Sequence, residues 1–198
     1  MMSISRKSSK SGKTGIIILI VVIALVLGIF IAVWTGYNKA VRLDEQAKSS
    51  WKQVDVQLTR RFDLIPNLVE TVKGYAKHEK ELFEHIADTR TKYFQAQGVQ
   101  GKVRAANEFQ GFLSRLLMLQ ENYPDLKADQ NFAALQVQLE GTENRIAVAR
   151  KDYNDSVRDV NTYARSFFGR SFCSIAGVEQ SEYFEATEEQ KAPTKVKF

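Results

Sequence analysis

A run of nineteen residues without a charge, residues 16–34, limits the folds open to this chain more than any other feature. At about 1.5 Å per residue, a helix over this run is about 28 Å long, close to the hydrocarbon thickness of a bilayer. Trp34 ends the run and Tyr37 follows it, where aromatic residues gather at a membrane surface. A cleaved signal peptide is the alternative, but the run is too long, and Trp34 stands where a cleavage site needs a small residue. We therefore predict a retained single-pass transmembrane helix over residues 16–36.

The excess of basic residues belongs mainly to the segment before this run. Residues 1–36 contain no acid and four of the 28 Lys and Arg residues, which are Arg6, Lys7, Lys10 and Lys13. The rest of the chain has 24 basic and 23 acidic residues. We predict that residues 1–15 form a disordered basic arm that faces anionic lipid headgroups. Since no strongly basic face is left elsewhere, we expect no nucleic-acid partner.

The basic residues leave the membrane orientation open. Four lie before the apolar run, and four follow within a similar distance, namely Lys39, Arg42, Lys48 and Lys52. The excess of Lys and Arg on the cytoplasmic side, which usually sets orientation, is therefore nearly balanced. The free amino terminus gives a slight preference for an N-terminus in the cytoplasm.

Amphipathic periodicity predicts long helices beyond residue 36, and Pro66 divides the first of them. Apolar residues recur at three-and-four spacing on both sides of Pro66. A proline removes a helical hydrogen bond and disfavours the helical conformation of the residue before it. Asn67 and Glu70 have the spacing of an N-cap and its reciprocal partner. We predict helices over residues 37–64 and 67–96, joined as a hairpin at Pro66, with a sharp kink as the alternative.

The hairpin also predicts partners for charged residues on the apolar seams. Arg61 and Glu70 lie equally far from the turn, so the expected partner of Arg61 is Glu70. The alternative is an exposed arginine whose aliphatic stem lies along the seam. In the same register, Glu79 is opposite Lys52.

Two further helices complete the predicted fold. A linker with two glycines at residues 95–101 precedes a helix over residues 102–121, and Pro124 marks a turn before the capping residues Asp129 and Asn131. A fourth helix, residues 131–168, keeps a regular apolar seam. The prediction is an all-α protein, with an N-terminal transmembrane helix followed by an antiparallel four-helix bundle of long helices (residues 37–168) and an irregular C-terminal tail (residues 169–198).

Several stretches of this sequence resemble the LemA family. They are QVDVQL at residues 53–58, RRFDLIPNL at 60–68, VKGYAKHE at 72–79, YPDLKA at 123–128, LEGTENRIAVAR at 139–150 and DYN at 152–154. The resemblance implies a helical bundle domain at the bacterial cytoplasmic membrane, an undefined activity and a relation to a magnetosome membrane protein. It also implies proximity to membrane metalloproteases and, against the preference above, a short N-terminus outside the cell.

Few residues offer catalytic chemistry. His78, Glu81 and His85 could share one helical face and hold zinc, but the second histidine of a metalloprotease helix is missing. A charged, solvated face is the simpler interpretation. The single cysteine, Cys173, excludes an intramolecular disulfide and a cysteine zinc site. There is no glycine-rich phosphate loop and no Gly-x-Ser-x-Gly motif, so we predict a non-enzymatic protein without a cofactor or metal.

These features together predict a membrane-anchored helical scaffold or adaptor of the bacterial envelope. Its expected partners are the lipid bilayer and other membrane or envelope proteins, and self-association stays open. The alternative is a metal-binding or hydrolytic protein that uses the face with His78, Glu81 and His85. The candidate partner-binding or structural polar residues are Asp55, Arg60, Arg61, Asp63, Pro66, Asn67, Glu70, His78, Glu79, Glu143, Asn144, Arg145 and Asn154.

Overall fold

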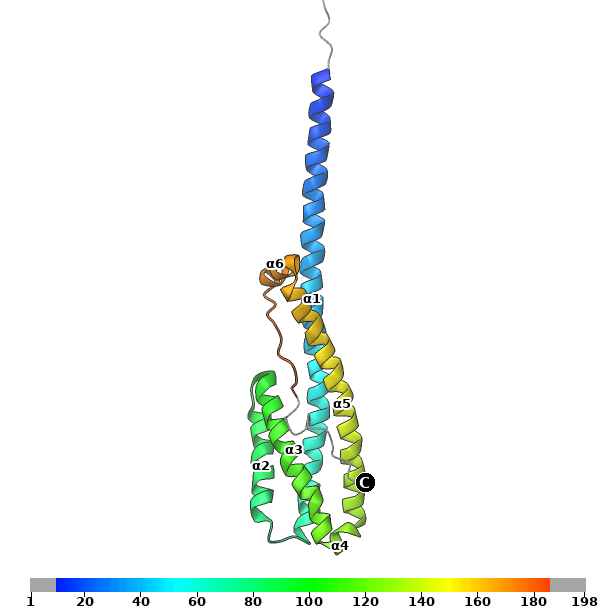
Figure 1. The fold of residues 1–198 in the computed structure, drawn as a ribbon, viewed down its shortest axis with the longest axis vertical. Helices are drawn as coiled ribbons and strands as arrows, with labels where there is room; N and C mark the ends of the chain where they lie inside the picture. Colours follow the sequence, from blue (N-terminus) through cyan, green and yellow to red (C-terminus); the bar gives the residue numbers. More distant parts are fainter. Residues whose placement is uncertain (1–9, 186–198) are drawn as a thin grey trace, which may run out of the picture. The chain divides into compact units, whose positions relative to one another are not determined.

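The structure is a computed structural model that describes residues 10–185. Over these residues it contains helices and no strand (Figure 1). The helices are α1 (Lys10–Lys73), α2 (Lys80–Gln95), α3 (Gly98–Asn122), α4 (Pro124–Lys127), α5 (Gln130–Arg165) and α6 (Phe167–Ala176). The predicted all-α class is confirmed.

The chain forms two compact units. The first combines the residues up to Arg42 with Tyr163–Glu179, and the second combines Leu43–Thr162 with the residues from Gln180 onward. Helices α1 and α5 contribute to both units, because each crosses a boundary between them. The two units are described separately.

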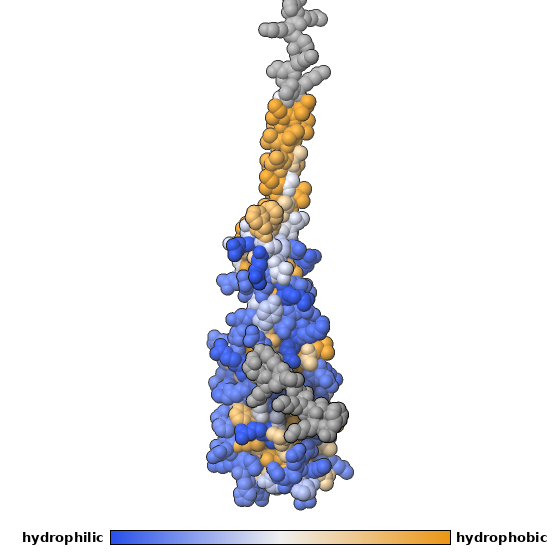
Figure 2. Space-filling view, in the orientation of Figure 1, coloured by the Kyte–Doolittle hydropathy of each residue, from blue (hydrophilic) through white to orange (hydrophobic). Residues whose placement is uncertain are grey.

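The first unit contains the apolar part of α1. Its side chains from Ile16 to Trp34 are exposed, and Figure 2 shows this stretch as a hydrophobic surface. Of the helices that the structure describes, α1 alone is long and apolar enough to cross a membrane. Lys10 and Lys13 belong to the start of α1, so this part of the predicted disordered arm is helical instead, because α1 extends beyond the apolar run. Arg6 and Lys7 lie outside the described residues.

The second unit is a four-helix bundle built on one face of α1. Its core combines side chains of α1, α2, α3 and α5, and Figure 1 shows α1 between α5 and the pair α2–α3. The stripe that α1 contributes consists of Val54, Leu58, Phe62, Ile65, Leu68 and Val72, all at most 2% exposed. Each such side chain stabilises the fold by about 1.5–3 kcal/mol on burial. The predicted bundle is therefore confirmed, although its helices begin and end at other residues.

The predicted hairpin at Pro66 is wrong, because α1 continues through Pro66 to Lys73. A proline has no N–H, so the carbonyl four residues earlier, that of Phe62, loses its helical donor. Arg90 of α2 donates its Nε–H to that carbonyl at 3.4 Å. Asn67 is not an N-cap; it lies within α1, and its carbonyl accepts a hydrogen bond from the Thr71 hydroxyl at 2.9 Å. The neighbouring helix thus replaces the lost donor and lets the proline stay inside α1.

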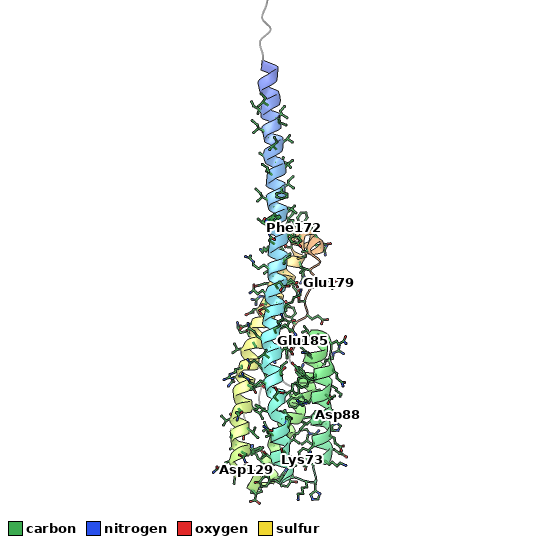
Figure 3. All side chains as sticks on the ribbon, turned by 180° about the vertical axis from the view of Figure 1, so that it is seen from behind. Lys73, Asp88, Asp129, Phe172, Glu179 and Glu185 are labelled. Carbon is green, nitrogen blue, oxygen red and sulfur yellow. The ribbon has the colours of Figure 1, made fainter. Side chains whose placement is uncertain are left out.

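The turn between the first two bundle helices lies at residues 74–79, and one hydrogen bond joins it to the start of α5. The Tyr75 hydroxyl donates to Asp129 Oδ2 at 2.9 Å, while Asp129 Oδ1 accepts the backbone N–H of Phe132 at 2.8 Å. These two donors, the backbone N–H first, hold the pKa of Asp129 below its usual value. The predicted cap at Asp129 is confirmed, and Figure 3 shows Asp129 beside Lys73 at the same end of the bundle.

The predicted linker and the last predicted helix also need correction. Helix α3 already begins at Gly98, so only Ala96 and Gln97 separate it from α2. The helix expected to reach residue 168 ends at Arg165, and the segment expected to be irregular from residue 169 begins within α6. Ser166 caps α6 by accepting the Gly169 N–H, and Gly177 ends it in a left-handed conformation with φ 67°.

An extended segment follows α6 and is held by two asparagines of α5. Asn161 accepts the Ser181 N–H and donates to the Ser181 carbonyl, both at 2.9 Å. Asn154 does the same for Phe184, at 2.8 and 3.1 Å. Seven helical residues rise about 10.5 Å and three extended residues about 10 Å, so the two spacings match. Phe184 is 4% exposed and packs against Trp51, with ring centroids 6.4 Å apart.

We expect each asparagine to protect one amide of this segment. Asn161→Ala removes both hydrogen bonds to Ser181, each worth about 1 kcal/mol, and so accelerates exchange of the Ser181 amide hydrogen by about fivefold or more. Asn154→Ala does the same at Phe184. Hydrogen exchange measured by NMR on the full chain in micelles tests this, with the exposed Asn144→Ala on the same helix as the control. Unchanged exchange at Ser181 in the first variant would contradict the pairing.

The donation from Arg90 to the Phe62 carbonyl predicts that two substitutions are not additive. Arg90→Ala should lower the free energy of unfolding by about 1 kcal/mol, because a carbonyl without a helical donor loses its partner. In a Pro66→Ala chain, the alanine N–H supplies a donor to the Phe62 carbonyl. Arg90→Ala in that chain should therefore lower the free energy of unfolding by no more than about half as much. Urea unfolding of the four chains in micelles measures the difference. The contacts of Arg90 with Asp63 and Phe94 are present in both backgrounds and cancel. Equal costs in both backgrounds would refute the explanation.

Candidate functional site

A groove between α1 and α5 hollows the surface of the second unit, and we call it the α1–α5 groove. Its volume is about 640 Å³. Side chains just outside the buried stripes of the two helices line it, namely Ser49, Lys52, Gln53, Val56, Gln57, Asn144, Arg145, Val148, Ala149 and Asp152. Val56 and Val148 are 57% and 61% exposed. The groove therefore offers aliphatic surface that no other part of the described chain covers.

Polar groups surround this aliphatic surface. Lys52, Arg145 and Asp152 are exposed charged residues of the lining. The side-chain oxygen of Gln57 is buried and has no hydrogen-bond partner among the described residues. A buried acceptor without a partner is uncommon and costly. An apolar centre with charged edges is typical of a surface that binds another helix.

Two of the predicted site residues, Asn144 and Arg145, line this groove, while the preceding Glu143 pairs with Arg61. Arg61 is 6% exposed, its Nη1 lies 2.8 Å from Glu143 Oε2, and its Nη2 donates to Gln110 Oε1. Burial lowers the pKa of the Arg61 guanidinium, and the charge of Glu143 opposes that shift. The expectation of a carboxylate partner was right, but the partner is Glu143 and not Glu70, because the hairpin at Pro66 does not form.

Glu70 and Asn67 instead lie on the surface of the bundle. Both are exposed, and they line a second hollow of about 420 Å³ between α1 and α5, with Asn131 on its other side. Lys52 lines the α1–α5 groove and Glu79 a hollow with α3 residues, so the predicted register between them is wrong as well. Lys52 and Glu79 therefore share no site.

Asp55 belongs to a polar cluster that joins three helices. Its carboxylate accepts hydrogen bonds from the Tyr93 hydroxyl of α2 at 2.5 Å and from Lys102 Nζ of α3 at 2.6 and 2.8 Å. Burial of the phenol, followed by the nearby carboxylate, raises the pKa of Tyr93. Sequence analysis missed both partners because they lie 38 and 47 residues from Asp55. With every charge paired, the cluster fastens helices and leaves no free acid or base.

The remaining predicted residues of α1 are at the surface. Arg60 and Pro66 are exposed, and Asp63 Oδ1 lies 3.8 Å from Arg90 Nη2. An ion pair between side chains that are 39% and 60% exposed contributes little to stability, because water screens it.

The three residues of the metal alternative do not share a helical face. Helix α2 begins at Lys80, so His78 lies in the preceding turn, where it is exposed. Glu81 and His85 line a hollow of about 410 Å³ with Arg115, and the His85 ring stacks on Phe112 with centroids 5.1 Å apart. Within the described part of the chain, no group of three or more His, Cys, Asp or Glu residues is placed to hold a metal ion. The shared face on which the metal alternative depended is therefore absent.

Comparison with known proteins gives relatives in bacteria. The magnetosome proteins MamQ 1 and MamQ 2 of Paramagnetospirillum magneticum are each 26% identical over 175 residues, which cover 75% of this chain. The chain spans 64% of the length of these relatives. Protein LemA of Metamycoplasma hominis is 21% identical over 166 residues, 83% of this chain and 76% of that protein. None of these names states a reaction.

The LemA family is also the family whose model matches the sequence. The match covers residues 50–198, more than half of the chain. It includes the Arg61–Glu143 pair, the Asp55 cluster, the paired asparagines and most of the α1–α5 groove. The chain belongs to the LemA family.

Proposed function

We propose that this protein is a membrane-anchored, non-enzymatic scaffold of the bacterial envelope that recruits another envelope protein by binding one of its helices in the α1–α5 groove. The observation that carries the proposal is the groove itself. Val56 and Val148 are more than half exposed on a bundle whose other aliphatic side chains are largely packed inside. Exposed aliphatic surface inside a hollow with charged edges favours a protein partner.

The proposed anchor is the apolar part of α1. An uncharged stretch of this length suits a single crossing of the cytoplasmic membrane. We propose that the basic residues before it, Arg6, Lys7, Lys10 and Lys13, contact anionic headgroups, with the N-terminus in the cytoplasm. Relatives in bacteria support a bacterial envelope as the setting.

The lining of the groove defines the chemistry of the proposed partner. Small aliphatic side chains on a helix would fit Val56 and Val148, and acidic residues beside them would face Lys52 and Arg145. A membrane metalloprotease is one envelope protein that the family resemblance suggests as a neighbour.

A non-enzymatic role is supported by how the buried polar groups are used. Arg61 is paired with Glu143, and Asp55 with Tyr93 and Lys102, so these groups hold helices together. A catalytic acid or base needs a free position beside a substrate, which neither cluster offers among the described residues.

We expect a photoreactive residue in the groove to capture a partner in intact cells. Benzoylphenylalanine at position 56 or 148 should give the same protein adduct, and benzoylphenylalanine at position 137 should not. Val137 is the matched control, because it is 68% exposed on α5 and lies outside the groove lining. The adduct should disappear when Lys52 and Arg145 are both changed to Glu, which reverses the charge at the edge.

Three outcomes would contradict this proposal. One is capture of lipid alone at positions 56 and 148. Another is an equal adduct at position 137. The third is an adduct with twice the mass of this chain, which would make the groove a contact between two copies instead of a site for another protein.

A further inference from the structure

Helix α6 of the first unit carries an exposed apolar face. Phe167, Phe168 and Ile175 are 87%, 69% and 65% exposed. Successive helical residues are about 100° apart, so these three side chains fall on one side of α6 and the buried Gly169 and Cys173 on the opposite side. The rings of Phe167 and Phe168 contact each other, with centroids 4.9 Å apart. A helix of ten residues with two phenylalanines and an isoleucine turned outward needs a covering that residues 10–185 do not supply.

Contacts with α1 fix the place of α6 along the apolar stretch. The Tyr163 hydroxyl at the end of α5 donates to the Gly36 carbonyl at 2.9 Å. Phe172 of α6 packs directly on Gly36, where a Cβ would overlap its ring. An apolar hollow of about 510 Å³ lies between α1 and α6. Its lining includes Ala32 and Thr35 of α1 and Phe167, Phe168 and Phe172 of α6. Since the uncharged run ends at Trp34, α6 lies where that run ends.

The charges around this point are mostly positive. Residues 36–42 and 163–179 contain four basic residues and one acid; the basic residues are Lys39, Arg42, Arg165 and Arg170, and the acid is Glu179. Lys39 lies over the Tyr163 ring, 4.7 Å from its centroid. Arg170 and Ser174 are exposed on the side of α6 next to its apolar face. A basic collar beside an apolar face complements an anionic membrane surface.

We propose that α6 is an interfacial helix, which lies in the boundary between headgroups and acyl chains and inserts Phe167, Phe168 and Ile175 among the lipid tails. The proposal rests on the membrane anchor of the proposed function. Lipid is the occupant that the position favours, because the apolar face of α6 begins where a membrane-spanning stretch would leave the hydrocarbon. Since Ser166 alone separates α6 from α5, this contact would fix the end of α5 at the bilayer surface.

Spin labels on the two sides of α6 test this in the full chain. In a Cys173→Ala background, single labels are placed with Phe168→Cys, Ile175→Cys and, as the control, Arg170→Cys, which lies about 120° around α6 from the middle of the apolar face. All three positions are exposed. The protein is reconstituted into vesicles of phosphatidylcholine and phosphatidylglycerol, and the accessibility of each label to oxygen and to a neutral nickel chelate is measured by power saturation. We expect labels 168 and 175 to shift toward oxygen, which concentrates among acyl chains, and label 170 toward the nickel chelate, which concentrates in water.

Two results would overturn the inference while leaving the anchor intact. Labels 168 and 175 could match label 170, which would put the apolar face of α6 in water. They could also be protected from both reagents, which would mean that protein covers the face. Failure of the anchor is a separate result, because the chain would then be extracted from the vesicles by alkaline carbonate.

Discussion

The bundle depends on one stripe of apolar side chains along α1. The side chains from Val54 to Val72 on that stripe are almost completely buried, and those of α2, α3 and α5 complete the same core. A helix whose buried stripe runs the length of a bundle cannot bend sharply without losing packing along that stripe. The core therefore favours a straight α1 at residue 66 strongly enough to retain a proline there, and Arg90 supplies the donor that the proline removes.

The competition between core packing and the helix-breaking tendency of Pro66 explains why the sequence predicts the wrong helix boundaries in the first half of the bundle. Local propensity places a helix end at Pro66, and it is correct for an isolated peptide. The donor that changes the outcome lies 28 residues away on another helix, where the sequence gives no sign of its purpose. The same error gave Arg61 the wrong predicted partner, Glu70 instead of Glu143, because the pairing with Glu70 required a turn at Pro66. By contrast, the seam of α5 needed no long-range information, and its apolar positions from Phe132 to Val160 are buried as the spacing predicted.

In the C-terminal part, some structural features could be predicted from the sequence and others could not. Ser166 before α6 and Gly177 after it are ordinary helix-terminal residues, so α6 could have been found by its caps even though its apolar residues lack a seam. The role of Asn154 and Asn161 could not have been predicted in this way. The two asparagines are seven residues apart on α5, and they pair with Phe184 and Ser181, which are three residues apart on the extended segment. The two spacings match only when that segment lies along α5. The predicted polar site included Asn154 and missed Asn161 for this reason.

The structure also distinguishes polar groups that build the bundle from groups available to others. Arg61, Asp55 and Asn154 were candidates for partner binding, and each is engaged inside the protein. Asn144 and Arg145 follow Glu143 directly, but a helix turns about 100° per residue, so they face away from the core and into the α1–α5 groove. A cluster of polar residues in a helical sequence therefore does not define a single surface. The angle of each residue around the helix decides whether its side chain holds helices together or faces the surface. The residues that face the α1–α5 groove, and not those paired between helices, are the ones that a partner could contact.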